Sequence, residues 1–181
     1  MAERLASPLD QYRNIPAPID DGVRIGHVHL KVADLDRALA FYCGVLGFAL
    51  TTSRQGAAFI SAGGYHHHIG LNTWESKGGS PPPPGTTGLY HTAILYPTRG
   101  KLADALRRLM EARVPLEGAS DHGVSEALYL RDPDDNGVEL YWDRPKEMWP
   151  RNPDGSLTMY TNRLDLQDLL GELARAPATP V

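Results

Sequence analysis

The chain has 181 residues and a formal net charge of −4, with 41% hydrophobic and 22% charged residues. This balance is typical of a globular protein, and the negative charge excludes the basic surface that binds nucleic acid. The sequence contains neither an apolar run long enough to cross a membrane nor an apolar signal core at its start. We therefore expect a cytoplasmic protein with neither nucleic acid nor membrane as a partner.

The first part of the chain predicts an arm followed by an unusual strand. Residues 1–22 are rich in Pro, Asp and Asn without a period, and we expect an N-terminal arm there. The strand Ile25–Val32 alternates strictly between apolar and polar side chains. Its polar face carries His27, His29 and Lys31. Because buried polar groups need partners, we expect this face to line a polar cavity.

A helix and three short strands complete the first unit. We expect the helix over Leu35–Leu46, because Asp34 is a preferred N-cap and Gly47 a preferred C-terminal stop. Gly-rich turns separate the strands that follow it. These strands are expected over residues 48–54, 57–62 and 66–74. The unit is a βαβββ module over residues 23–77.

The same order of elements then begins again. A Gly/Pro-rich linker over residues 78–87 can form neither a helix nor a paired strand. A second βαβββ module follows over residues 88–145, and a C-terminal loop and short helix over residues 146–181. Within the second module we expect strands over residues 88–96, 116–120, 127–131 and 138–142, and a helix that Thr98 opens.

The two modules align when the sequence is shifted by 64 places, which brings His27 onto His91 and Leu30 onto Ile94. Only two copies of a long period indicate a duplicated unit rather than a solenoid. We therefore predict an α+β fold, with two βαβββ modules in tandem. Their half-barrel sheets are expected to form a cleft, with the helices outside and one domain overall.

Three residues on separate strands have the donor types of a facial metal triad. They are His27, His91 and Glu139. Two imidazoles and one carboxylate suit Fe(II) and leave coordination positions open, although Mn(II), Ni(II) and Zn(II) can use the same donors. A single strand histidine is usually an ordinary polar group, but the equivalence of His27 and His91 favours ligands. The strand Ile69–Asn72 matches Val138–Tyr141 at a shift of 69 places, which brings Gly70 onto Glu139, so the first module would supply no fourth ligand.

Three further residues are expected on the same polar side. His68, at the end of the run Tyr65–His68, is interpreted as an acid/base because the imidazole pKa lies near neutral pH. Three consecutive histidines could also be adventitious metal binders, but the acid/base interpretation of His68 is favoured. Tyr129 and His122 are expected near Glu139, although Tyr129 could simply be a strand aromatic.

These motifs resemble the vicinal oxygen chelate superfamily, which includes glyoxalase I, bleomycin-resistance proteins and extradiol dioxygenases. The resemblance covers about residues 23–145 and rests on the stretch His27–Tyr42 and on Asp132–Glu139. Within the superfamily, the stretch Tyr129–Glu139 and the pair His122–Gly123 look most like the catechol 2,3-dioxygenase branch. Enzymes of that branch have four modules, whereas this chain has two.

The resemblance implies a metal-dependent extradiol ring-cleaving dioxygenase that acts on a catechol-like aromatic with O2. His27, His91 and Glu139 would hold Fe(II). His68 would be the acid/base, Tyr129 would hold a substrate oxygen and His122 would lie at the rim. The partners would be a small aromatic diol and O2, and a homodimer is compatible with this assignment.

Two other functions on the same fold stay open. A glyoxalase-type isomerase or lyase normally uses four protein ligands, and Gly70 argues against it. A metal-free protein that binds an aromatic ligand or drug would need no triad, so the retained donors argue against that role.

Overall fold

The computed structural model describes Tyr12 and residues 16–175, so most of the expected arm over residues 1–22 lies outside the described residues. The first module contains β1 (Val28–Lys31), α1 (Leu35–Leu39), the π-helix η2 (Ala40–Val45), β2 (Ala49–Arg54), β3 (Ala57–Ser61) and β4 (Ile69–Asn72). The second contains β5 (Thr92–Leu95), α2 (Arg99–Glu111), β6 (Leu116–Asp121), β7 (Ser125–Arg131) and β8 (Gly137–Asp143). The tail adds η3 (Lys146–Met148), β9 (Asn162–Arg163) and α3 (Leu166–Arg175).

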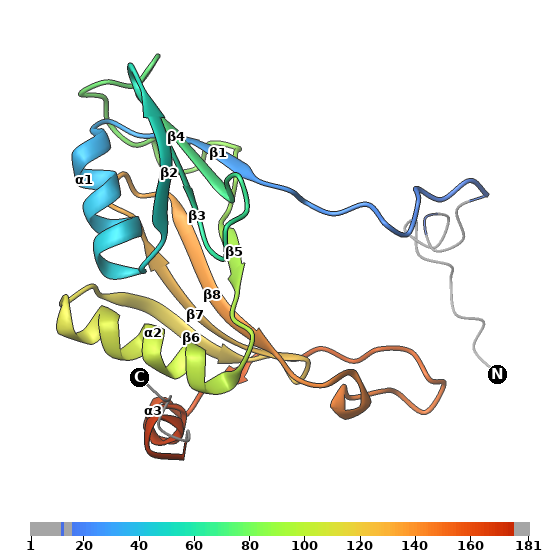
Figure 1. Cartoon of the computed structure of the whole chain (residues 1–181). Helices are drawn as coiled ribbons and strands as arrows, with labels where there is room; N and C mark the ends of the chain where they lie inside the picture. The colour runs from blue at the N-terminus through green and yellow to red at the C-terminus, as the bar shows by residue number, and fades with distance from the viewer. Residues whose placement is uncertain (1–11, 13–15, 176–181) are drawn as a thin grey trace.

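The predicted α+β architecture is confirmed. The first sheet has the order β1-β4-β3-β2 and the second has the order β5-β8-β7-β6-β9. Figure 1 shows the two sheets one after the other along the molecule, with α1 and α2 on the same side of them. Among the described residues, no helix is both long and apolar enough to cross a membrane.

The strand pairing confirms that the two modules are copies of one unit. β1 pairs with β4 in parallel, with Val28 opposite Ile69, and β5 pairs with β8 in parallel, with Thr92 opposite Val138. One residue further on, His29 lies opposite Gly70 and Ala93 opposite Glu139. Gly70 and Glu139 are therefore structurally equivalent, as the sequence alignment predicts.

The predicted helix starts are correct, because the side chains of Asp34 and Thr98 cap α1 and α2. Four predicted elements need correction. The strands expected over Ile25–Val32 and residues 66–74 are shorter, because they pair only over Val28–Lys31 and Ile69–Asn72. The helix expected over Leu35–Leu46 changes from α to π geometry at Ala40. The strand expected over residues 88–96 has its first ladder pairing only at Thr92, because residues 88–91 do not pair with β8 and residues 88–90 are exposed.

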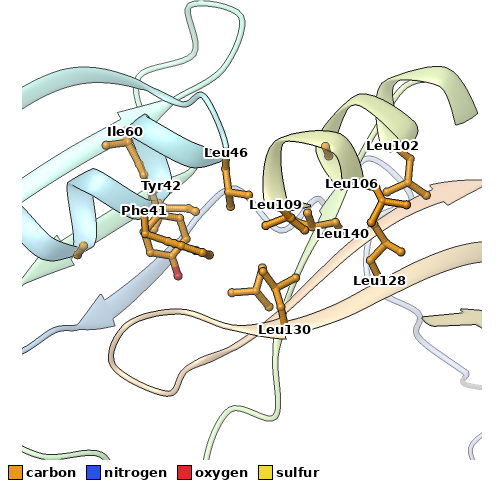
Figure 2. Close-up of a cluster of buried hydrophobic side chains, with 14 of the residues drawn as sticks. Phe41, Tyr42, Leu46, Ile60, Leu102, Leu106, Leu109, Leu128, Leu130 and Leu140 are labelled. Carbon is orange, nitrogen blue, oxygen red and sulfur yellow. The ribbon is translucent and has the colours of Figure 1, made fainter. Parts of the chain in front are cut away.

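One hydrophobic core joins the two modules. Figure 2 shows Tyr42 of η2 near Leu130 of β7, with the apolar face of α2 beside them. On α2, Leu102, Leu106 and Leu109 are at most 1% exposed, and burying each such side chain contributes about 1.5–3 kcal/mol. The Tyr42 hydroxyl donates a 3.0 Å hydrogen bond to Asp132 in the β7–β8 turn, which connects the modules by a buried polar contact.

The tail packs against the outside of the second module. β9 pairs with β6, and α3 packs on α2, with Leu169 fully buried between them. Arg99 at the start of α2 binds Asp168 and Glu172 of α3. The sequence predicts this helix but leaves its position open, and the structure places it outside the sheet.

Candidate metal centre

Four of the six predicted site residues come together in the second module. Glu139 lies on β8 directly opposite Tyr129 of β7, so both side chains project from the same face of the sheet. His91 precedes β5, the parallel neighbour of β8, and His122 lies in the turn between β6 and β7. Side chains from neighbouring strands thus meet on one face of the sheet.

The side chains form a continuous set of polar contacts centred on the Glu139 carboxylate. His91 Nε2 lies 2.9 Å from Oε2, and the Tyr129 hydroxyl donates a 3.0 Å hydrogen bond to Oε1. His122 Nε2 lies 2.7 Å from the Tyr129 hydroxyl oxygen. The Glu139 side chain is only 13% exposed, so these partners replace most of its water.

Tyr129 keeps its proton in this environment. Burial raises the pKa of Tyr129 well above its ordinary value, and the charge and hydrogen bond of Glu139 raise it further. A neutral phenol beside a carboxylate is a hydrogen-bond donor to that carboxylate and an acceptor for a third group. The side chain therefore orients Glu139 and can also accept from a ligand.

A pocket of about 390 Å³ opens beside these residues. Its lining includes His91, His122 and Tyr129 from the second module and Thr161 from the tail. Thr161 Oγ1 lies 3.3 Å from His122 Nδ1, and the Tyr160 carbonyl oxygen lies 2.9 Å from the same nitrogen. The prediction misses these tail residues, since no periodic pattern precedes the two-residue strand β9.

The structure does not bring His27 and His68 into this set. The His27 side chain is exposed and contacts the His67 ring at a tilt of 48°, with 4.4 Å between centroids, while His68 Nδ1 lies 3.0 Å from Ser61 Oγ. His27 and His68 line a different pocket of about 440 Å³, between the start of β1 and β5. Their assigned roles as ligand and acid/base stay predictions.

The His29 ring covers the space where a side chain at Gly70 would lie. A Cβ atom at Gly70 would lie 3.0 Å from the His29 ring, and that ring also contacts Phe59 and Trp74. Burial lowers the pKa of His29, and the nearby His27 and Arg54 lower it further. The sequence predicts His29 only as part of the polar face, because its contact with Gly70 depends on the pairing of β1 with β4.

The donor atoms of His91 and Glu139 fit adjacent ligands of one metal ion. With metal–ligand distances of about 2.0–2.2 Å, two neighbouring donors at right angles lie about 3 Å apart. The separation of 2.9 Å between Nε2 and Oε2 agrees with this geometry. Tyr129 holds the other carboxylate oxygen, as outer partners of metal ligands commonly do. In the described residues no group of three or more His, Cys, Asp and Glu side chains is close enough to bind a metal.

The sequence of both modules matches a known family. The profile described as "Glyoxalase/Bleomycin resistance protein/Dioxygenase superfamily" matches residues 24–140. The chain belongs to this superfamily. The match spans both modules, from just before β1 into β8.

Individual relatives give a finer comparison. The chain is 42% identical over 154 residues to catechol-2,3-dioxygenase of Bacillus subtilis, covering 85% of this chain and 53% of that protein. It is 36% identical to biphenyl-2,3-diol 1,2-dioxygenase 3 of Rhodococcus globerulus, covering 66% and 63%. The chain thus spans about half to two thirds of these relatives' lengths.

A solved structure supports the fold alone. The crystal structure of a glyoxylase/bleomycin resistance protein/dioxygenase domain from Frankia sp. EAN1pec has a TM-score of 0.57 and 21% sequence identity. The similarity covers 68% of this chain and 94% of that domain.

Proposed function

We propose that this chain is a metal-dependent extradiol dioxygenase that cleaves a catechol-like aromatic with O2. The observation that carries the proposal is the contact of His91 with Glu139, with Tyr129 and His122 arranged behind the carboxylate. The relatives named as catechol and biphenyl-diol dioxygenases agree with this chemistry.

In this proposal His91 Nε2 and Glu139 Oε2 hold the metal, Fe(II) by preference, and His27 is the third ligand. The bound metal supplies Lewis acidity and electron transfer between the aromatic diol and O2. Two imidazole nitrogens and one carboxylate oxygen also suit Mn(II), Ni(II) and Zn(II), so the identity of the metal is part of the test.

The protein side chains supply orientation and proton positions. The Tyr129 hydroxyl, which keeps its proton, fixes Glu139 and accepts a hydrogen bond from a diol hydroxyl at the pocket. His122 lies on the far side of Tyr129 and limits the pocket at its rim. His68 is proposed as the group that moves protons to and from the substrate oxygens.

The direct test is oxygen uptake by protein reconstituted with Fe(II) under argon and then mixed with air and a panel of catechols. Stoichiometric loss of O2 together with a yellow ring-cleaved product supports the proposal. If iron-loaded protein consumes no O2 with any catechol, the proposal is wrong.

A glyoxalase-type isomerase or lyase is the second candidate, because the superfamily profile includes that chemistry. Supplying a hemithioacetal substrate without O2 distinguishes the isomerase from the dioxygenase. Product formation under argon would favour the isomerase, and the missing side chain at Gly70 leads us to expect none.

A further inference from the structure

The tail residues Tyr160 and Thr161 enclose one side of His122. The Tyr160 amide donates to the His122 carbonyl at 3.4 Å, and the Tyr160 carbonyl oxygen lies 2.9 Å from His122 Nδ1. The Thr161 hydroxyl lies 3.3 Å from that nitrogen. His122 is therefore contacted through both its backbone and its ring by one short segment of the tail.

The rest of the tail holds this segment in place. β9 pairs Asn162 with Asp121 and Arg163 with Ser120, immediately before His122 in the chain. Beyond β9, Leu164 is buried in the core, and α3 is fixed to the second module as described above. The segment is thus anchored on its C-terminal side by both pairing and burial.

The glycine that follows His122 allows the tail to approach the turn closely. Gly123 has a φ of 78°, and a Cβ atom there would lie 2.7 Å from the Tyr160 ring and 2.8 Å from Pro150. Only glycine adopts this backbone conformation freely and also leaves room for both groups. The close approach of turn and tail is therefore built into the sequence.

The contacts fix which ring nitrogen carries a proton. A backbone carbonyl oxygen can only accept a hydrogen bond, so its 2.9 Å contact requires a proton on His122 Nδ1. Without that proton, two lone pairs would face each other. The tautomer of a histidine is commonly set in this way by the partner of its other nitrogen.

We propose that Tyr160 and Thr161 are positioning residues of the candidate site, which hold His122 with Nδ1 protonated and direct Nε2 at the Tyr129 hydroxyl. The segment acts through His122 and does not contact Glu139. The effect of the tail on the His122 tautomer does not depend on the proposed function; only the part that His122 then plays in the reaction rests on it.

The fixed proton determines how Tyr129 is used. The contacts from Tyr160 to Glu139 through His122 and Tyr129 are three hydrogen bonds and need three protons. A neutral imidazole and a phenol supply only two, so all three bonds, with Tyr129 donating to Glu139, form together only when His122 carries protons on both Nδ1 and Nε2. When His122 is neutral, its bare Nε2 competes with Glu139 for the Tyr129 proton. By keeping a proton on Nδ1, the tail thus makes Nε2 the nitrogen that faces Tyr129 as an acceptor.

The test is the tautomer of His122 in metal-free protein, measured by long-range ¹H–¹⁵N NMR at a pH about two units above the ordinary imidazole pKa of about 6.5. The His122 signals are those missing from His122→Gln. We expect the Nδ1–H form in the wild type. An Nε2–H form would overturn the proposal.

A pair of variants tests the contribution of the tail. Tyr160→Pro removes the amide that donates to the His122 backbone carbonyl, which loosens the segment that carries the Tyr160 carbonyl oxygen facing Nδ1. We therefore expect the ratio of Nδ1–H to Nε2–H forms to fall about fivefold, which corresponds to the loss of about one ordinary hydrogen bond at Nδ1. Tyr160→Phe keeps the backbone and should resemble the wild type. A folded Tyr160→Pro protein with an unchanged tautomer would contradict the proposal. If Tyr160→Pro does not fold, the wild-type tautomer alone decides.

Because the measurement uses neither metal nor substrate, it is independent of the proposed function. Protein with the expected tautomer but no oxygen uptake would disprove the dioxygenase assignment and leave the positioning role intact. The opposite result would leave the activity and remove the role of the tail.

Discussion

The two modules share one topology and one register but differ in how a pair of neighbouring positions is filled. In the first module, His29 lies over Gly70, which has no side chain. In the second, the small Ala93 lies opposite Glu139. The larger residue of the pair thus lies on the first strand, β1, in one module and on the last strand, β8, in the other. Only the second module has a carboxylate at this pair.

This difference shows how a duplicated scaffold acquires a single site. The second module surrounds its carboxylate with Tyr129, His122 and the tail. The first module contributes imidazoles that contact mainly one another and the neighbouring aromatic rings. The second module is therefore expected to supply two of the three proposed metal ligands, whereas the first supplies His27 and the group for proton transfer.

The largest effect is expected from Glu139→Gln. The amide cannot supply the anionic oxygen next to His91 Nε2, so metal affinity should fall by more than about 100-fold. The fold should change little, because the carboxylate lies beside a pocket rather than in the core. Metal content after dialysis gives the readout, and Glu111→Gln on the exposed side of α2 is the matched control. Full metal retention by Glu139→Gln would remove Glu139 from the ligand set.

The next effect concerns the first module. His68→Phe should keep the metal and lower turnover by about 10²–10⁴-fold, the usual contribution of a general acid or base. Metal content and oxygen uptake are measured on the same sample. The comparable variant His66→Phe should retain activity, because His66 lines neither pocket. If His68→Phe instead loses the metal, His68 is a ligand and the division between the modules is wrong.

A smaller effect is expected where the modules meet. Tyr42→Phe removes the hydroxyl that donates to the buried Asp132, and we expect a loss of about 1–2 kcal/mol in the free energy of unfolding. Burial and then the Asp132 charge raise the pKa of Tyr42, so this donor persists at all ordinary pH values. Urea unfolding measures the change, with Tyr160→Phe at a more exposed ring as control. An unchanged midpoint would mean that the modules do not depend on this contact.

Much of this arrangement could be predicted from the sequence, since alternation and caps depend on nearest neighbours. The strand faces, the caps Asp34 and Thr98, and the equivalence of Gly70 with Glu139 all follow from local patterns. The grouping of His91 with Glu139 also follows, because adjacent strands share a face.

Other features depend on packing that no local pattern encodes. The contact of Tyr160 with His122 joins residues far apart in the chain through a carbonyl group, and every residue type has a carbonyl. The separate position of His27 depends on how the two sheets lie relative to each other. Side-chain type and spacing carry no information about that orientation.

The smallest expected effect tests the pair of His29 and Gly70 directly. A Cβ atom at Gly70 would approach the His29 ring to 3.0 Å, so Gly70→Ala requires that ring to move. The net effect of Gly70→Ala alone combines this crowding with the lower chain entropy of alanine, so its sign is uninformative.

In a double-mutant cycle with His29→Ala, the entropy term cancels. We then expect Gly70→Ala to be about 1 kcal/mol more favourable in the His29→Ala background, as measured by urea unfolding. The equivalent cycle in the second module, with Ala93→Gly and Glu139→Gln, should show a smaller coupling because neither of these residues carries a ring. Equal couplings in the two modules would mean that the His29 ring is not the reason why position 70 has no side chain.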